Sequence, residues 1–539
     1  MASLPFADHT DSPLDFSPAE SESLRASLAV REGYRDAYWR ERDPILRDRL
    51  LWRAQSFRHT VHLLPGQSIL ELGHGGGQFT RSLVRVTRGE NPITAVSFLT
   101  TPSETPGTTP PAVERLVLEK LPGPLAGRRF DCVVAHDLLD RTNASDLMRW
   151  IYELLEPGGE LILYESNPWN PVHQLRWSVS RLIGRRDPRH LMNRSRLYEL
   201  LSEIGFVRVY AVFNDFVFAP LTRPLIWLLR PLSTLLENAP ILQNMAGSIL
   251  LHGQKPPHRA PRLQKPLPAH PELLGAFSVV IPCRNEEMNI GPLVSRLLAL
   301  YGPYVHEIIT VNDGSTDRTG AVMDELAARD SRVRPLHRRA PHGVGHAIAE
   351  GLRAARGRYV LTMDCDFQHL LPEFRDLFDA AAQGWDVVVG SRFSRHSVLL
   401  NYPFLKIVAN RGFHLLARLL LWRKFRDVTN NLKILRREVV QDLRLQQPGF
   451  AVNAETGLQP LLLGYSVREI PISWINRTPG MGSSSFRLVK VGGGYGSVLL
   501  HLWLGHLFKS GPYRHLRPTS PAARVENFPP TSAKTAASP

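Results

Sequence analysis

Two aspartates separated by one residue follow an apolar run in the second half of the chain. The run Y-V-L-T-M (359–363) is typical of a buried strand. Asp364 and Asp366 come directly after it, with Gln368 next in the alternating series. Because alternate side chains of an extended segment point the same way, we expect the two carboxylates to face one side. Such carboxylates can hold a divalent cation that neutralises a diphosphate leaving group. A lone D-x-D is also common in solvated turns, so the surrounding segments must show whether this one belongs to a metal site.

Polar residues follow other apolar runs of this half. The runs 277–282, 307–312 and 386–391 read as strands separated by helical patterns, and Asp313 and Arg392 follow the last two. In an open parallel sheet ligands bind outside the carboxyl ends of the strands, so these side chains are expected at one site. Asp313 is then placed to take ribose hydroxyls or a base edge. The alternative is a tight turn followed by a helix N-cap.

These segments resemble the serial motifs of the family 2 inverting glycosyltransferases with the GT-A fold. Within that family the likeness is to dolichyl-phosphate mannose synthase and its polyprenyl-phosphate relatives. The likeness covers roughly residues 277–508. It rests on P-C-R-N-E-E-M-N-I (282–290), V-N-D-G-S-T-D-R-T (311–319), M-D-C-D-F-Q-H (363–369), G-S-R (390–392), D-V-T-N-N-L-K (427–433), E-T-G-L-Q-P-L-L-L-G-Y (455–465) and N-R-T-P-G-M-G-S-S-S-F (476–486).

The resemblance implies a metal-dependent transfer of sugar from a GDP- or UDP-sugar to a polyprenyl phosphate. It implies that Asp364, Asp366 and Gln368 bind Mg²⁺ or Mn²⁺. It gives catalytic roles to Asp366, Asp427 and Arg477. The residues implied to bind the nucleotide sugar are Pro282, Arg284, Glu286, Asp313, Asp364 and Arg392. Transfer to a soluble glycan or small molecule stays open as the alternative.

A basic amphipathic stretch predicts contact with a membrane surface. The segment 413–424 places Arg418, Arg423 and Lys424 beside apolar side chains, namely Phe413, Leu416, Leu420 and Trp422. Such a helix can lie in a bilayer interface, and a core-facing helix with snorkelling arginines is the alternative. The run 491–508 reads as a core or interfacial segment and not as a spanning helix. We therefore expect a peripheral protein at the cytoplasmic face of a membrane.

A glycine-rich turn follows an apolar run in the first half of the chain. In S-I-L-E-L-G-H-G-G-G-Q-F (68–79) the glycines Gly73, Gly75 and Gly77 allow close approach of a ligand to the backbone. With F-D-C-V-V-A-H-D (130–137) and E-P-G-G-E-L-I-L-Y-E (156–165), the turn resembles the class I S-adenosylmethionine-dependent methyltransferases over roughly residues 45–250. By resemblance the cofactor contacts are Glu71, Gly73, Gly75, Gly77, Glu119 and Asp137. The second strand ends in Ser97 where such enzymes usually carry an acid, so a degenerate, non-catalytic domain is the alternative.

Composition and charge predict two α/β domains in one chain. The 539 residues exceed what one core holds, and a net charge of +15 favours anionic partners. No recognition motif supports a nucleic-acid partner. We expect a disordered N-terminus (1–25), a Rossmann-like methyltransferase domain (26–253), a proline-rich basic linker (254–275), a GT-A glycosyltransferase domain (276–509) and a disordered tail (510–539).

Overall fold

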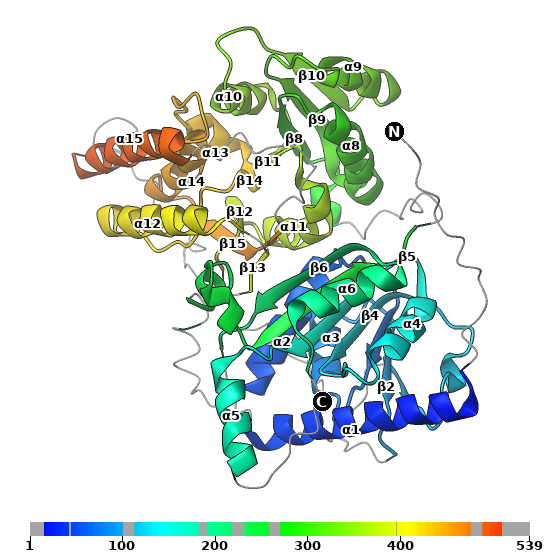
Figure 1. The fold of residues 1–539 in the computed structure, drawn as a ribbon. Coiled ribbons are helices and arrows are strands. Elements are labelled where there is room, and N and C mark those ends of the chain that lie inside the picture. Colours follow the sequence, from blue (N-terminus) through cyan, green and yellow to red (C-terminus); the bar gives the residue numbers. More distant parts are fainter. Residues whose placement is uncertain are drawn as a thin grey trace, which may run out of the picture. The chain divides into compact units, whose positions relative to one another are not determined.

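The structure, a computed structural model, describes residues 16–42, 45–100, 113–182, 191–217, 229, 232–257, 270–394, 396–400, 402–475 and 488–508. The chain divides into two compact units, Met1–Arg262 (unit 1) and Leu263–Pro539 (unit 2), each with its own seven-stranded sheet (Figure 1). The predicted α/β class is confirmed, with two sheets that are mainly parallel. In the described part of the chain, no helix has the length and apolar character needed to cross a membrane.

Unit 1 is built on a sheet of order β3-β2-β1-β4-β5-β7-β6, in which β7 runs antiparallel to both of its neighbours. Its strands are β1 (Ile69–Leu72), β2 (Ile93–Ser97), β3 (Val113–Val117), β4 (Phe130–His136), β5 (Leu155–Ser166), β6 (Val207–Asn214) and β7 (Ser248–Gln254). Its helices include α1 (Pro18–Arg42), α2 (Leu46–Thr60), α3 (Gln78–Thr87), α4 (Ala144–Leu154), α5 (Pro171–Leu182) and α6 (Arg194–Ile204).

Helix packing covers both faces of this sheet's central strands, which accounts for their apolar sequences. All four residues of β1 are buried, as expected for a parallel strand with helices on both sides. Leu70 and Leu72 belong to one core cluster together with α4 residues at helical spacing, such as Leu147, Ile151 and Leu154.

Our prediction of disorder over residues 1–25 is wrong from residue 18 onward, because α1 already begins at Pro18 (dark blue in Figure 1). Ser17 and Glu20 form a capping box: the Ser17 hydroxyl accepts from the Glu20 N–H at 3.3 Å, and the Glu20 carboxylate accepts from the Ser17 N–H at 2.9 Å. Leu24 and Leu28 then bury in the core. Residues 1–15 lie outside the described residues.

The predicted linker is shorter than residues 254–275. Gln254 is the last residue of β7, and Lys255 is buried with its Nζ donating to the carbonyls of Tyr152 (2.8 Å) and Leu155 (3.1 Å). At the other side, Pro271–Leu273 forms a 3₁₀ turn with Leu273 buried in unit 2. The middle of the linker (258–269) and the predicted tail (510–539) lie outside the described residues.

Unit 2 has the sheet order β10-β9-β8-β11-β14-β12-β15, with β14 antiparallel to β11 and β12, and a separate β13–β16 pair. Its strands are β8 (Phe277–Cys283), β9 (Val305–Asn312), β10 (Val333–His337), β11 (Tyr359–Thr362), β12 (Val387–Ser391), β13 (Val398–Leu400), β14 (Lys433–Arg436), β15 (Val467–Pro471) and β16 (Ser473–Ile475). Its helices are α8 (Glu287–Tyr301), α9 (Thr319–Arg329), α10 (Val344–Ala354), α11 (Phe374–Ala382), α12 (Phe404–Leu421), α13 (Arg437–Asp442), α14 (Val452–Leu462) and α15 (Leu488–Leu507).

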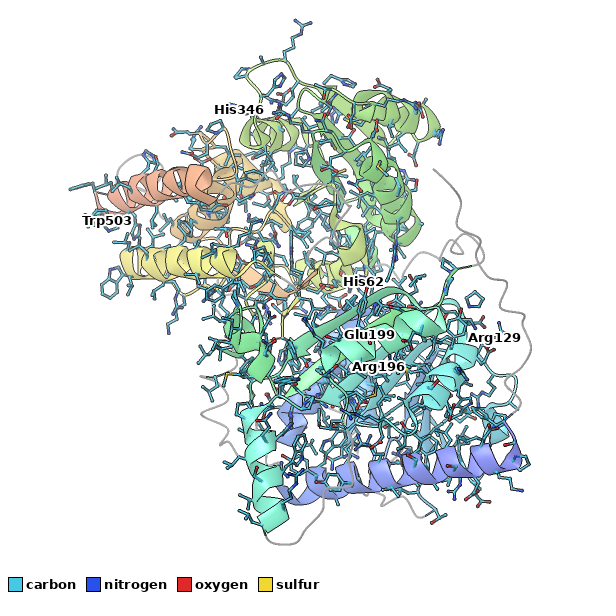
Figure 2. All side chains as sticks on the ribbon, in the orientation of Figure 1. His62, Arg129, Arg196, Glu199, His346 and Trp503 are labelled. Carbon is cyan, nitrogen blue, oxygen red and sulfur yellow. The ribbon has the colours of Figure 1, made fainter. Side chains whose placement is uncertain are left out.

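Three helices of unit 2 form a second core beside the sheet. Leu421 of α12, Leu458 of α14 and Leu502 of α15 share one buried cluster, and Trp503 of α15 packs against it (Figure 2). Most of the run 491–508 therefore belongs to the helix α15, which has one face in this core. The first part of the basic segment, 413–421, is the end of the longer helix α12, which follows Pro403; Trp422 ends the helix in a left-handed conformation, so Arg423 and Lys424 lie beyond it.

Candidate functional site

The carboxyl ends of β8 and β11 meet where the strand order of unit 2 reverses. β8 pairs in parallel with both β9 and β11, although the chain passes through β9 and β10 before it reaches β11. The neighbouring Cys283, at the end of β8, and burial raise the pKa of the Cys365 thiol, which follows β11. The segment after β8 and the two aspartates after β11 therefore lie together, at the kind of crevice where open α/β sheets bind ligands.

Asp364 and Asp366 form an acidic pair at this crevice. Asn431 Nδ2 donates to Asp364 Oδ1 at 2.7 Å. Burial, together with the charge of Asp366, raises the pKa of Asp364 to about 7. A cation bound between the two carboxylates would relieve this repulsion. Among the described residues, no group of three or more His, Cys, Asp or Glu side chains could hold a metal ion, so a cation here would need further ligands, such as phosphate oxygens.

Arg392 and Asp427 form a buried, two-point ion pair. The Nε and Nη2 atoms of Arg392 donate to the two carboxylate oxygens of Asp427 at 2.8 and 3.0 Å, and the Arg392 main-chain N–H donates to the same carboxylate at 3.0 Å. Although burial alone would raise it, the Arg392 guanidinium holds the pKa of Asp427 well below its usual range. Asp427 is thus a fixed anion that orients Arg392, with little basicity of its own.

Two buried groups near this pair were not identified from the sequence. Lys433 Nζ donates to the carbonyls of Asn430 and Asn453, and burial lowers its pKa to about 7. His414 has a fully buried side chain, with Nδ1 2.7 Å from the Asn410 carbonyl, and burial lowers its pKa to about 4. Lys433 ends the run D-V-T-N-N-L-K, one of the motifs behind the family resemblance, and this motif could have identified it as a residue of the site. His414 lies in the amphipathic stretch, where no signal marked it.

Asp313 is nearly buried and bridges two loops at the carboxyl end of β9. Its carboxylate forms an ion pair with Arg338 and accepts from the Gly343 N–H at 2.7 Å, directly before α10. The main-chain N–H of Asp313 donates to the Cys283 carbonyl at 2.9 Å. The structure therefore places Asp313 beside the segment that follows β8, with part of its hydrogen-bonding capacity already used.

The structure describes some of the remaining residues of unit 2 that were predicted to bind the nucleotide sugar or the metal, and leaves others outside the described residues. Pro282 lies in β8, Arg284 is exposed just after it, and Glu286 accepts from Asn289 Nδ2 at 2.6 Å at the start of α8. Arg477 and the side chain of Gln368 lie outside the described residues, so their predicted roles stay predictions.

The glycine-rich turn of unit 1 is in contact with α1. Glu32, which is fully buried, accepts from the Gly75 N–H (2.7 Å), the Ser97 hydroxyl (2.9 Å) and the Phe98 N–H (2.7 Å). Asp36 accepts from the Gly76 N–H at 3.0 Å. A side chain added at Gly75 would come within 2.7 Å of Asp36 Oδ1. The N–H groups that could receive a ligand are therefore bound to carboxylates of the same unit.

The acid missing at the end of β2 is thus supplied from elsewhere, because Glu32 of α1 bonds to Ser97 there. Of the other predicted cofactor contacts, Glu71 is buried in β1 and accepts from Thr80 Oγ1 at 2.7 Å, with its pKa raised to about 7 by burial. Asp137 accepts from the Ser166 hydroxyl at 2.6 Å, and Glu119 is exposed.

Comparison with known proteins bears on unit 2. The family model described as Glycosyl transferase family 2 matches residues 278–444. A polyprenol monophosphomannose synthase of Mycolicibacterium smegmatis is 34% identical over 214 residues, which cover 38% of this chain and 80% of the relative. A dolichol-phosphate mannosyltransferase of Pyrococcus furiosus is 31% identical over 207 residues, which cover 38% of this chain and 57% of the relative.

Among solved structures, glucosyl-3-phosphoglycerate synthase from Mycobacterium tuberculosis in complex with uridine diphosphate matches at 20% identity and a TM-score of 0.35, over 44% of this chain and 86% of that chain. The family match supports the predicted GT-A fold for the C-terminal part, and the curated relatives confirm the predicted resemblance to polyprenol-phosphate sugar synthases. A relative above 30% identity that is matched over four fifths of its length shares its family with this chain. The chain therefore belongs to glycosyl transferase family 2.

Proposed function

We propose that unit 2 transfers a sugar from a GDP- or UDP-sugar to a polyprenyl phosphate, with inversion and with a divalent metal. The observation that carries the proposal is the acidic pair Asp364 and Asp366 at the reversal of the strand order, beside the segment after β8. The names of the two relatives support a lipid phosphate as acceptor, since both are synthases or transferases of polyprenol or dolichol phosphates.

The acidic pair suits Mg²⁺ or Mn²⁺ by charge and by chemistry. Mg²⁺ is commonly held by one or two carboxylates together with substrate phosphates, and burial, followed by the like charge of Asp366, raises the pKa of Asp364. Asp364 and Asp366 would hold the ion, with Gln368 as a further ligand, and Asn431 fixes Asp364. When bound, the ion supplies charge stabilisation to the departing nucleoside diphosphate.

The Arg392–Asp427 ion pair favours a phosphate acceptor over an alcohol. Transfer to a hydroxyl needs a general base, and Asp427, with its pKa held far below neutral, is a weak one. A phosphate monoester has a second pKa of roughly 6 and is already largely a dianion at neutral pH. It needs positive charge beside the anionic donor instead. Arg392, oriented by Asp427, and Arg477 are proposed to supply that charge.

Contact with a membrane surface is proposed through α12 and α15. Leu415, Leu416 and Leu419 on α12 are each more than half exposed, and Trp422 is 89% exposed, while Phe413 and Leu420 of the predicted apolar set pack against the core instead. Leu504 and Phe508 at the end of α15 are also exposed. Arg418 on α12 and Arg423 and Lys424 just after it are also exposed. Apolar and basic side chains together suit an anionic bilayer interface, which fits a location at the cytoplasmic face of a membrane.

For unit 1 the contacts of α1 favour a non-catalytic platform over a working S-adenosylmethionine-dependent methyltransferase. A cofactor on the glycine-rich turn would have to displace Glu32 and Asp36 from the main-chain N–H groups they bind. Calorimetry on the full chain should therefore show no heat with S-adenosylmethionine. Saturable binding, abolished in Gly75→Val, would restore the proposal of a methyltransferase.

A donor screen tests the function of unit 2. GDP- and UDP-sugars are incubated with Mn²⁺ and a short polyprenyl phosphate, and product masses are read with and without S-adenosylmethionine. We expect one nucleotide sugar to give a lipid product heavier by one sugar, independently of S-adenosylmethionine. Failure of every donor with the lipid, alongside turnover on a soluble glycan, would favour the alternative acceptor.

A further inference from the structure

A small cavity in unit 1 has walls that are mainly arginine. It lies where α1, α2 and α5 meet the residues that follow β4 and end β5, Asp137 and Ser166. Five lining side chains are arginines, against a single carboxylate, that of Asp137. The arginines are Arg31, Arg35, Arg49, Arg53 and Arg176.

Four of these arginines are almost fully buried, and most have no carboxylate partner. Arg31, Arg35, Arg49 and Arg53 are each at most 9% exposed. Among the described residues only Arg49 of the five forms an ion pair, with Asp215 at 2.7 Å. Arg31 donates to the Leu139 carbonyl at 2.8 Å, and Arg35 to the His136 carbonyl at 3.0 Å. Carbonyl oxygens satisfy N–H groups but do not neutralise a buried positive charge, which is costly to leave uncompensated.

Several donors here have no acceptor. The Nε atoms of Arg31, Arg35 and Arg53 are buried without a hydrogen-bond partner. The guanidinium groups of Arg53 and Arg176 lie over the rings of Tyr164 (5.1 Å) and Tyr38 (4.8 Å). Ring faces attract a cation but accept no strong hydrogen bond. The arginines are thus held in place with part of their donor capacity unused.

Neighbouring groups respond to this concentration of positive charge. Burial, and next the charge of Arg49, lower the pKa of the Arg53 guanidinium. Burial, followed by Arg53, Arg35 and Arg49, lowers the pKa of His136 well below its usual range. The buried carboxyl group of Glu165 does little to offset this charge, since burial raises its pKa to about 8. An anion in the cavity would lower the electrostatic free energy of all these cations.

The size of the cavity limits what this anion can be. Its volume is about 40 Å³, and about 10–15 Å³ of such volume holds one water molecule. There is room for a single tetrahedral group and none for an adenosyl cofactor. Planar guanidinium forks match the oxygens of a phosphoryl group, which can accept from two of them at once.

We propose that this arginine cavity binds the phosphoryl group of a phosphate monoester. Arg31, Arg53 and Arg176 donate to its oxygens, and the rest of the ligand extends past Tyr34 and Tyr38, which line the same cavity. The monoester is either a soluble metabolite or the head group of a lipid, since both present the same dianion. The proposal concerns unit 1 alone and does not depend on glycosyl transfer by unit 2.

Calorimetry with inorganic phosphate tests the proposal on the full chain, in EDTA and at constant ionic strength set with chloride. We expect saturable one-site binding at pH 7. Arg176→Gln, a partly exposed position, should weaken it at least tenfold. Arg181→Gln is the matched control: it makes the same charge change, and Arg181 is exposed on the same helix outside the cavity wall. Arg53→Met should abolish binding, and its circular dichroism shows whether the variant is folded.

Two further arms identify the source of the phosphoryl group. Competition by glycerol 3-phosphate would support a soluble monoester, and binding to phosphatidic acid vesicles but not phosphatidylcholine vesicles would support a lipid head group. Either result must be lost in Arg176→Gln. No saturable binding in any arm, or equal binding by Arg176→Gln and Arg181→Gln, would overturn the proposal.

Discussion

The two units differ in how they use the charged groups at the carboxyl ends of their central strands. In unit 2, burial, followed by the charge of the neighbouring Asp366, raises the pKa of Asp364 to about 7. In unit 1, Glu32 and Asp36 occupy the comparable region, but their carboxylates accept from main-chain N–H groups of the glycine-rich turn. The same α/β architecture therefore places carboxylates in two different roles. In unit 1 the carboxylates accept from main-chain N–H groups and stabilise the fold, and in unit 2 a neighbouring acidic pair is proposed to bind a cation.

The comparison predicts that Glu32 acts on stability. Glu32→Ala leaves the Gly75 N–H, the Ser97 hydroxyl and the Phe98 N–H buried without their acceptor. At roughly 1–3 kcal/mol for each unsatisfied group, we expect unit 1 to lose about 3–5 kcal/mol of its unfolding free energy. Urea unfolding measures the loss. Glu22→Ala, at an exposed position of the same helix, is the control. If both variants unfold at the same urea concentration as the wild type, Glu32 of α1 does not stabilise the glycine-rich turn.

Asp366, by contrast, should act on turnover. Asp366→Asn removes one of the two charges proposed to hold the metal, and electrostatic stabilisation of this kind is worth roughly 3–4 kcal/mol. We expect sugar transfer to fall by about 10²–10³-fold with no loss of thermal stability, because the repulsion on Asp364 is relieved. Asp324→Asn, an exposed acid in the same unit, should leave the rate unchanged. A normal rate for Asp366→Asn, or in EDTA, would contradict the metal assignment.

The pH dependence of stability tests the buried environment beside Arg392. Burial lowers the pKa of His414 from its usual 6.5 to about 4. The unfolded chain therefore binds this proton first as the pH falls, so unit 2 should lose up to about 3 kcal/mol between pH 6.5 and pH 4. Urea midpoints over this range should fall less steeply for His414→Gln than for the wild type. His306→Gln, at an exposed position, should keep the full slope, and equal slopes for all three would remove His414 as the cause.

The smallest effect is expected at the membrane surface. Replacing Leu419 and Trp422 by serine removes two exposed apolar side chains at the end of α12. We expect binding to anionic vesicles to weaken about tenfold, since burying such groups stabilises by roughly 1–3 kcal/mol each and the contact is partial. Sedimentation with vesicles measures it. The same result from Leu182→Ser, which removes an exposed leucine from unit 1, would show that no particular surface is involved.

Local sequence predicts much of the site in unit 2. The strands after which Asp313, Asp364 and Arg392 stand were identified within two residues of their observed ends, because a buried parallel strand is a short apolar run. The rule that ligands bind at carboxyl ends then placed these residues at one edge. The pairing of Arg392 with Asp427 was not predictable, since 35 residues separate them and nothing local marks a long-range ion pair.

Local sequence also failed at the N-terminus, where residues 1–25 were predicted to be disordered. Residues 17–20 (S-P-A-E) are a helix start, with serine as N-cap, proline first and glutamate third. The acidic and serine-rich composition around them pointed to disorder instead. Glu32 then reaches Gly75, 43 residues away. Neither the acid at the end of β2 nor the arginine cavity could be located before α1 was placed against the sheet.

A competition between two acceptors tests directly whether unit 2 transfers sugar to a lipid phosphate and not to an alcohol. The full chain, Mn²⁺ and the active nucleotide sugar are given equal concentrations of a short polyprenyl phosphate and of the corresponding polyprenol, and both products are quantified by mass. The fixed, weakly basic Asp427 and the proposed arginines predict sugar on the phosphate almost exclusively, with the product lost in Asp366→Asn. Sugar on the alcohol, at a rate that Asp366→Asn and EDTA leave unchanged, would contradict metal-dependent transfer to a phosphate acceptor.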